Sequence, residues 1–239
     1  ALFVMKDKDA ADAFGNQYVY ANNWPPDARP LPLYLTPDGG LTLAPPAAAD
    51  AATTFLYDPG NPTPKLGGRN VFPPSGAHDQ RDIEARDDVI VFETAPLTGD
   101  VTMIGAFLAT LYVASDTGDA DYSVRLTDVY PDGRSMLMLD GILRASYRNS
   151  ISKPKAPAPD EIVELTVDCG DTALTFAKNH RIRIAIAGAD TASCQPRTAA
   201  SKQTVYHDAA HPSHITLPLW NAEGRAAISS RGVKDSIPH

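Results

Sequence analysis

Three histidines, His207, His211 and His214, lie close together in the sequence, and Asp208 stands beside the first of them. Imidazole and carboxylate groups are zinc ligands, and a zinc site needs three or four of them to converge. These residues surround a turn between two short apolar stretches, without the helical or Cys-x-x-Cys framework of a typical metal site. We therefore expect His207 and His214 to pack or to form hydrogen bonds within a hairpin rather than to bind a metal.

Hydrolytic chemistry would need a nucleophile that is activated by a neighbouring base. The G-x-S-x-G elbow, which places a serine on a strained turn between a strand and a helix, does not occur in the sequence. The nearest match, PSG at 74–76, lacks both the spacing and a following helical pattern. We assign no catalytic residue, no metal site and no cofactor to this chain.

Two charged segments invite other interpretations. DTGDAD at 116–121 offers carboxylate oxygens, which are the ligands of calcium, but it lacks the spacing and the final glutamate of an EF-hand loop. A solvated turn between strands is the preferred interpretation of that segment. AHDQRDIEAR at 77–86 is either a surface of alternating charge or a loop that arginine–carboxylate pairs pin against another domain. The sequence leaves the second choice open.

Composition restricts the class of partner. The chain has 239 residues, 43% of them apolar, with a formal net charge of −8 and no run of lysine or arginine. A groove for nucleic acid and attachment to an anionic membrane are therefore not expected, and no apolar stretch approaches the roughly 18 residues of a membrane span. Cys169 and Cys194 are interpreted as two free thiols, with a disulfide between them as the alternative, so the compartment stays open.

Alternation of apolar and polar residues predicts β-strands along most of the chain. VRLTDVYPDGRS at 124–135 predicts a strand and a tight turn, and the apolar run at 136–143 predicts a returning strand with a bulge or bend at Gly141. TPDGG at 36–40 predicts a second hairpin, and the charge-free run at 101–113 a long buried strand. The fold class is all-β: a jelly-roll sandwich of two antiparallel sheets.

Several longer motifs occur in an order typical of one family. They are NNWPP at 22–26, PLYLTPDGGL at 32–41, GGRNVF at 67–72, DQRDIEARDDVIVFETAPL at 79–97, SDTGDADYSVRLTDVYPDGRS at 115–135, DGILRASYRNS at 140–150, TALTFAKNHRIRIAIAG at 172–188 and VYHDAAHPSHITLPL at 205–219. On these motifs the chain resembles the C-terminal domain of the X-Pro dipeptidyl-peptidase and CocE/NonD hydrolase family.

The resemblance implies a jelly roll of the galactose-binding-like type, joined to an upstream α/β-hydrolase domain that carries a Ser-His-Asp triad. No position of that triad matches a residue of this chain. In the family the jelly roll packs on the catalytic domain, helps to close the substrate pocket and often takes part in homo-oligomer contacts. Trp24, Asp79, Gln80 and Arg81 lie in the matching segments, and we expect them at the domain interface or in the pocket wall.

The same resemblance divides the chain into three parts. Residues 1–20 would be the end of, or the linker from, the α/β-hydrolase domain, 21–220 the jelly roll, and 221–239 a C-terminal arm or tail. Lys6 stands where the family usually has glycine, and GADTASCQPRTA at 188–199 lacks the usual Phe-Pro pair. The function of that turn in relatives is therefore not carried over.

A function of a different class stays open beside the hydrolase domain. Jelly rolls of the galactose-binding-like type often bind sugars on their loops, and aromatic side chains stack on sugar rings. Trp24, Tyr34, Tyr57 and Trp220 are the residues that a stand-alone carbohydrate-binding module would use.

Overall fold

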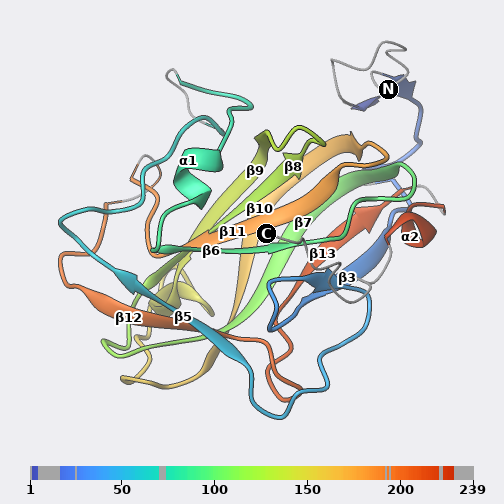
Figure 1. Cartoon of the computed structure of the whole chain (residues 1–239). Helices are drawn as coiled ribbons and strands as arrows, with labels where there is room; N and C mark the ends of the chain where they lie inside the picture. The colour runs from blue at the N-terminus through green and yellow to red at the C-terminus, as the bar shows by residue number, and fades with distance from the viewer. Residues whose placement is uncertain are drawn as a thin grey trace, which may run out of the picture.

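Two antiparallel β-sheets that pack face to face form the body of the protein (Figure 1). The structure is a computed structural model that describes residues 2–4, 17–24, 26–69, 74–191, 193, 195–220 and 223–228. The larger sheet consists of β3 (Arg29–Leu35), β4 (Leu41–Thr42), β5 (Ala52–Tyr57), β7 (Val101–Ser115), β10 (Val163–Phe176), β12 (Ser201–Tyr206) and β13 (His214–Leu219). The smaller sheet has the order β6 (Val89–Glu93), β11 (Arg181–Ala187), β8 (Asp121–Val129) and β9 (Ser135–Arg144). The predicted sandwich is confirmed.

The long strand β7 organises the larger sheet. β10 pairs with β7 along one edge, whereas β13 and β12 share the other edge. β13 pairs with residues between 103 and 110, and β12 pairs with residues 112–115. The strands that flank His207 and His214 therefore do not pair with each other as a regular hairpin, and the loop between them is closed by one antiparallel bridge, between His207 and Pro212.

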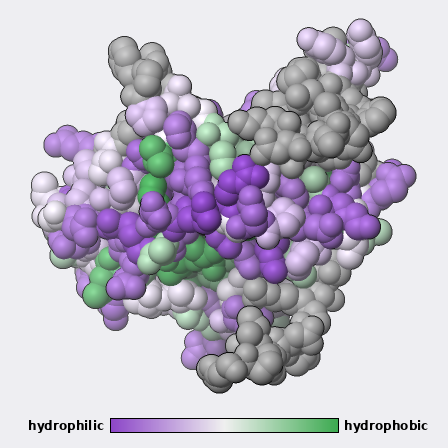
Figure 2. Space-filling view, turned by 45° about the horizontal axis from the view of Figure 1, so that its top comes forward, coloured by the Kyte–Doolittle hydropathy of each residue, from purple (hydrophilic) through white to green (hydrophobic). Residues whose placement is uncertain are grey.

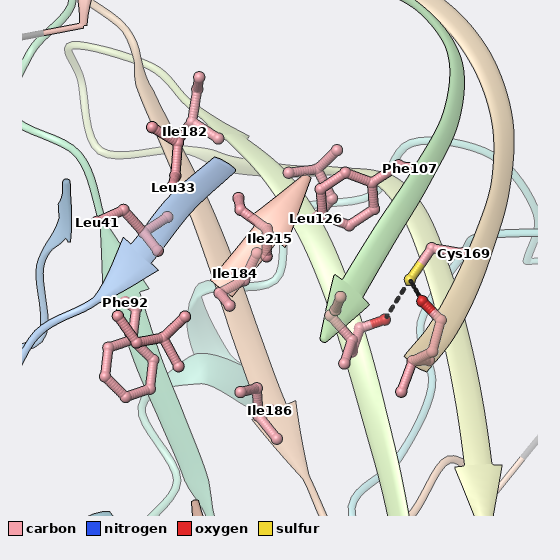
Figure 3. Packing of buried hydrophobic residues seen from close by; sticks show 14 of the residues in the cluster. Leu33, Leu41, Phe92, Phe107, Leu126, Cys169, Ile182, Ile184, Ile186 and Ile215 are labelled. Carbon is pink, nitrogen blue, oxygen red and sulfur yellow. Dashed lines mark hydrogen bonds between the residues drawn. The ribbon is translucent and has the colours of Figure 1, made fainter. Parts of the chain in front are cut away.

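The hydrophobic core lies between the two sheets. Along β10 the burial alternates as period-two patterning requires, with Val163, Leu165, Val167 and Cys169 buried and the residues between them exposed. Figure 3 shows Leu33 and Ile215 of the larger sheet packing near Leu126 and Ile184 of the smaller one. Apolar side chains from both sheets thus fill one continuous core.

The β8–β9 hairpin forms where the sequence predicted it, but its bulge lies elsewhere. Leu126 pairs with Leu139 and Thr127 pairs with Leu137, so the extra residue is Met138. Gly141 pairs regularly with Val124. The prediction of a bulge at Gly141 is wrong. A glycine is needed at this position because β10 approaches its backbone closely.

The remaining elements are short. β1 (Leu2–Val4) pairs with β2 (Gln17–Val19), α1 (Arg81–Glu84) precedes β6, and the 3-10 helix Ala145–Tyr147 follows β9. α2 (Gly224–Ala227) packs on the sandwich, with Ala227 and Ile228 in the main core. An arm was expected from residue 221; residues 223–228 instead belong to the packed body, and 229–239 lie outside the described residues. None of the helices in the described ranges has the length and apolar composition that crossing a bilayer requires.

Candidate functional site

The outer face of the four-stranded sheet carries buried charges under a covering segment, which consists of residues 58–69 and 74–88. On β8 the side chains of Ser123, Arg125 and Thr127 point away from the core, yet all three are buried. Arg125 Nη2 donates to the carbonyl of Pro64 at 2.9 Å, and Thr127 Oγ1 donates to Glu84 Oε1 at 3.2 Å. In a sheet with one exposed face, these β8 side chains would face water. Here they hold the covering segment on the sheet.

The ammonium group of Lys65 lies at the centre of this face. Lys65 Nζ is 2.5 Å from Asp140 Oδ2, 2.8 Å from Ser193 Oγ and 3.5 Å from Asp190 Oδ2. The side chains of Lys65, Asp140 and Asp190 are only 3%, 6% and 1% exposed. One cation thus joins the covering segment, strand β9 and the turn after β11, through two hydrogen bonds and one ion pair.

Arg125 supplies the second positive charge of the cluster. Burial lowers the pKa of its guanidinium, while Asp190 and Asp140 act in the opposite direction. Two cations, Lys65 and Arg125, thereby balance two carboxylates in a region from which water is largely excluded. Such a cluster is costly to disrupt, because removing one partner leaves an uncompensated buried charge.

Asp140 also fixes the base of the next loop. Its Oδ1 accepts from the amide of Arg69 at 3.2 Å, and Arg69 Nη2 donates to the Asp140 carbonyl at 2.6 Å. Gly67 and Gly68 have φ values of +81° and +80°, and a Cβ on Gly68 would lie 2.3 Å from Asp140 Oδ1. Gly68 and Gly76 exchange backbone hydrogen bonds at 2.8 and 2.9 Å. Only glycine fits against the Asp140 carboxylate at this point.

Three of the four predicted site residues meet at the start of β9. Asp79 forms an ion pair with Arg81 at 2.6 Å and accepts from the Ser135 amide at 3.1 Å. Burial alone would raise the pKa of Asp79, but the hydrogen bonds from Arg81 and Ser135 outweigh it and lower the pKa. Gln80 is 1% exposed, and its Nε2 donates to the carbonyls of Leu66 and His78. Gln80 thus links this cluster to Leu66, in the earlier part of the covering segment.

Trp24 lies apart from these three residues in the sequence and in its contacts. It follows β2 and is 49% exposed. Among the described residues, no hydrogen bond or ion pair joins Trp24 to Asp79, Gln80 or Arg81.

A second group of ion pairs fixes α1 to the sheet. Arg183 on β11 contacts Glu84 Oε2 and Glu93 Oε2, both at 2.6 Å. Burial disfavours the charged guanidinium, but these two carboxylates outweigh it and raise the pKa of Arg183. Glu84 also accepts from Ser135 Oγ at 2.8 Å. In the described part of the chain, Arg183, Glu84 and Glu93 therefore form ion pairs that fix α1 and β6 to β11.

The sequence of this sandwich matches one family over almost its whole length. Residues 4–232 match the X-Pro dipeptidyl-peptidase C-terminal non-catalytic domain. The chain belongs to this family. The resemblance stated from its motifs is confirmed.

Relatives of this C-terminal domain are much longer proteins. Cocaine esterase of Rhodococcus sp. (strain MB1 Bresler) is 35% identical over 222 residues, which cover 82% of this chain and 39% of that protein. An aminopeptidase from a marine sediment Thaumarchaeota archaeon superposes with a TM-score of 0.73 at 25% identity, over 84% of this chain and 38% of that one. An α-amino acid ester hydrolase superposes with a TM-score of 0.68 at 26% identity, over 80% of this chain and 36% of that one. The chain therefore spans about two fifths of the length of these relatives.

The histidines that suggested a metal site have separate partners in this C-terminal domain. His207 Nε2 lies 2.9 Å from Thr53 Oγ1, His211 Nδ1 lies 3.1 Å from Asp208 Oδ1, and His214 Nδ1 lies 2.9 Å from the carbonyl of Pro212. Two carboxylates of the acidic segment 116–121 also have partners within the domain: Asp119 forms an ion pair with Arg197, and Asp121 forms one with Arg144. In the described ranges, no group of three or more His, Cys, Asp or Glu side chains is arranged to hold a metal ion.

The aromatic residues proposed for sugar stacking are differently exposed. Tyr57 is buried and its hydroxyl donates to the carbonyl of Arg197 at 2.6 Å, and Tyr34 packs against His214. A cavity of about 750 Å³ lies between the end of β9 and the turn at 195–198, and the aromatic residue that lines it is Tyr147. Tyr57 is therefore unavailable to a sugar, and the carbohydrate alternative gains no support from this arrangement.

The cluster of Lys65, Asp140 and Asp190 could not be predicted from the sequence, since the first two residues stand 75 positions apart. Arg125 gave no sign of its burial either, because an arginine that alternates with the apolar residues of a strand is expected to face water. Cys169 is a free thiol buried in the core, and Cys194 lies outside the described residues, so the disulfide alternative stays untested.

Proposed function

We propose that this chain is the C-terminal domain of a serine hydrolase of ester or amide bonds, in which it packs on the catalytic domain and shapes the substrate pocket. The observation that carries the proposal is the family match from residue 4 to 232, together with relatives that are more than twice as long. The names of those relatives, an esterase, an aminopeptidase and an ester hydrolase, point to acyl transfer. X-Pro dipeptidyl-peptidase activity belongs to the same reaction class.

The chemistry is assigned to the part of the relatives that this chain does not match. There a serine would attack the carbonyl, a histidine would take its proton, and an oxyanion hole would stabilise the tetrahedral intermediate. The contribution of this chain would be positional: a rigid wall that excludes water and holds the substrate in a reactive geometry. The described residues of this chain would take no part in bond making.

The upper end of the sandwich in Figure 1 is the favoured contact surface. The N-terminal hairpin β1–β2, helix α1 and the turn between β8 and β9 all lie toward this end. Since the unmatched part of the relatives precedes a C-terminal domain, it would attach at the N-terminal hairpin, close to this end. Residues 1–20 would then form the junction, and Trp24, Asp79, Gln80 and Arg81 the interface or pocket wall.

The character of the surface suits an interface within one protein. Figure 2 turns this end toward the viewer and shows mainly hydrophilic residues, with hydrophobic ones confined to small patches. Contacts between domains of one chain are more polar than obligate interfaces. Exposed Trp24 and Leu66 would add apolar contact area.

The test compares the isolated chain with a full-length protein that contains it. The isolated chain should not hydrolyse p-nitrophenyl acetate above background, whereas the full-length protein should, and a serine-directed inhibitor should abolish the activity. Inhibitor-sensitive hydrolysis by the isolated chain would overturn the assignment of chemistry to the upstream part. Self-association through this domain stays a prediction, and light scattering of the full-length protein measures it.

A further inference from the structure

We propose that Lys65 is a positioning residue: its buried ammonium group sets the place of the loop base at 66–69 and 76–80, and through it the pocket wall of the hydrolase. This inference rests on the proposed function, and it names the residue that holds the pocket wall in place.

Residues 62–66 of the covering segment are held mainly by side chains from the sheet below them. Pro62 and Pro64 have no N–H group, so they cannot join a strand ladder. The carbonyls of Pro64 and Leu66 accept instead from the buried side chains of Arg125 and Gln80. Lys65 stands between these two carbonyls and is the one residue of the segment 64–66 whose own side chain reaches both β9 and the turn at 190–193 among the described contacts.

Loss of the ammonium group would propagate through Asp140. One oxygen of Asp140 accepts from Lys65, and the other accepts from the amide of Arg69 while it fills the space beside Gly68. Without Lys65, the Asp140 carboxylate would be drawn toward Arg125, which already interacts with it. Gly68 and Arg69 would then lose their contacts with the Asp140 carboxylate. The backbone hydrogen bonds between Gly68 and Gly76 would weaken as a result.

The same displacement would reach the predicted interface residues. Gln80 Nε2 bridges the carbonyls of Leu66 and His78, and the Gln80 amide donates to Ser135 at the start of β9. Asp79 and Arg81 flank Gln80 directly. A shift at Lys65 is thus passed by two fixed hydrogen bonds to the surface where the catalytic domain is expected.

The experiment uses the full-length hydrolase with Lys65→Met, which keeps the length of the side chain and removes its charge. Lys202→Met is the matched control, because Lys202 is exposed on β12. Hydrogen exchange is measured on peptides that contain Gly68 and Gly76, and kinetics are measured with p-nitrophenyl acetate and with a bulky aromatic ester. We expect exchange at the loop base to accelerate about tenfold, and KM for the bulky ester to rise about tenfold with little change in kcat for the acetate.

The two readouts separate the two hypotheses. Unchanged exchange at Gly68 and Gly76 would overturn the role of Lys65, whatever the kinetics. Accelerated exchange with unchanged KM for both esters would show that Lys65 holds the loop but that the loop forms no pocket wall, which overturns the pocket-shaping part of the proposed function. If Lys65→Met does not fold, Ser193→Ala serves instead, since Ser193 is exposed and its loss removes one acceptor of the ammonium. It should give the same two changes, about two- to threefold in size, and no change in either would overturn the inference.

Discussion

Gly141 on β9 lies directly against Cys169 on β10, which belongs to the other sheet of the sandwich. A Cβ on Gly141 would be 2.7 Å from the carbonyl oxygen of Asp168 and 3.0 Å from the Cys169 sulfur. Both distances are shorter than a van der Waals contact. β9 therefore has a glycine because the backbone of another strand occupies the space of a side chain.

Gly141→Ala should destabilise the domain. The new methyl group meets backbone atoms, which cannot rotate away, so the sheets would have to separate locally at a cost of about 1–3 kcal/mol. Urea unfolding followed by circular dichroism measures the change. Gly99→Ala is the matched control, because its Cβ would lie 3.5 Å from Ala227 Cβ, an ordinary contact. Equal stabilities of the two variants would contradict the steric argument.

This glycine also illustrates how far the fold could be predicted. Turn chemistry at 130–134 and the alternation on both sides predicted the β8–β9 hairpin correctly. A glycine in a strand indicates either a bulge or a close approach, and the approaching strand starts more than twenty residues later in the chain. The sequence contains no local information that separates these two causes. The pairing of β12 and β13 with β7 was not predicted for the same reason, because strand pairing depends on residues that are far apart in the sequence.

The candidate site was predicted in part. Family motifs pointed to Asp79, Gln80 and Arg81, which do form one hydrogen-bonded cluster at the start of β9. The charges under the covering segment were not predicted, since single charged residues in loops or on one face of a strand usually face water. Their burial follows from a proline-rich segment that crosses the outer face of a sheet, and that crossing depends on tertiary structure.

The thiol of Cys169 should resist alkylation in the folded protein. Burial raises its pKa far above the ordinary value of 9.0, and the nearby Asp140 acts in the same direction. Reaction with a disulfide reagent requires an accessible thiolate. In a Cys194→Ser background, we expect no labelling at pH 8 until urea unfolds the domain, as followed by absorbance. Rapid labelling of the native protein would contradict the buried position.

His207 should make the domain less stable in mild acid. Burial lowers its pKa below the ordinary value of 6.5, despite Asp208 beside it. The unfolded chain therefore binds a proton more readily than the folded one, so stability is full above about pH 6.5 and falls as the pH drops toward the lower folded pKa. Urea unfolding at pH 7.5 and pH 5.5 measures the loss.

His207→Gln is the comparison that isolates this effect. Glutamine does not titrate and can still bond to Thr53, so the difference in stability between the two pH values should become smaller. An identical pH dependence of the variant and the wild type would assign the loss to other groups.

Arg125→Met should be the most destabilising of these changes. The arginine is 1% exposed and donates to the Pro64 carbonyl. Without it, Asp140 and Asp190 would share Lys65 as their remaining buried cation, and breaking a buried charge cluster on one side costs about 3–5 kcal/mol. Arg29→Met is the control, since Arg29 is exposed on β3 and its loss should change stability by about 0.5 kcal/mol or less. Urea midpoints measure both, and a loss for Arg125→Met as small as that of the control would show that the cluster contributes little to folding.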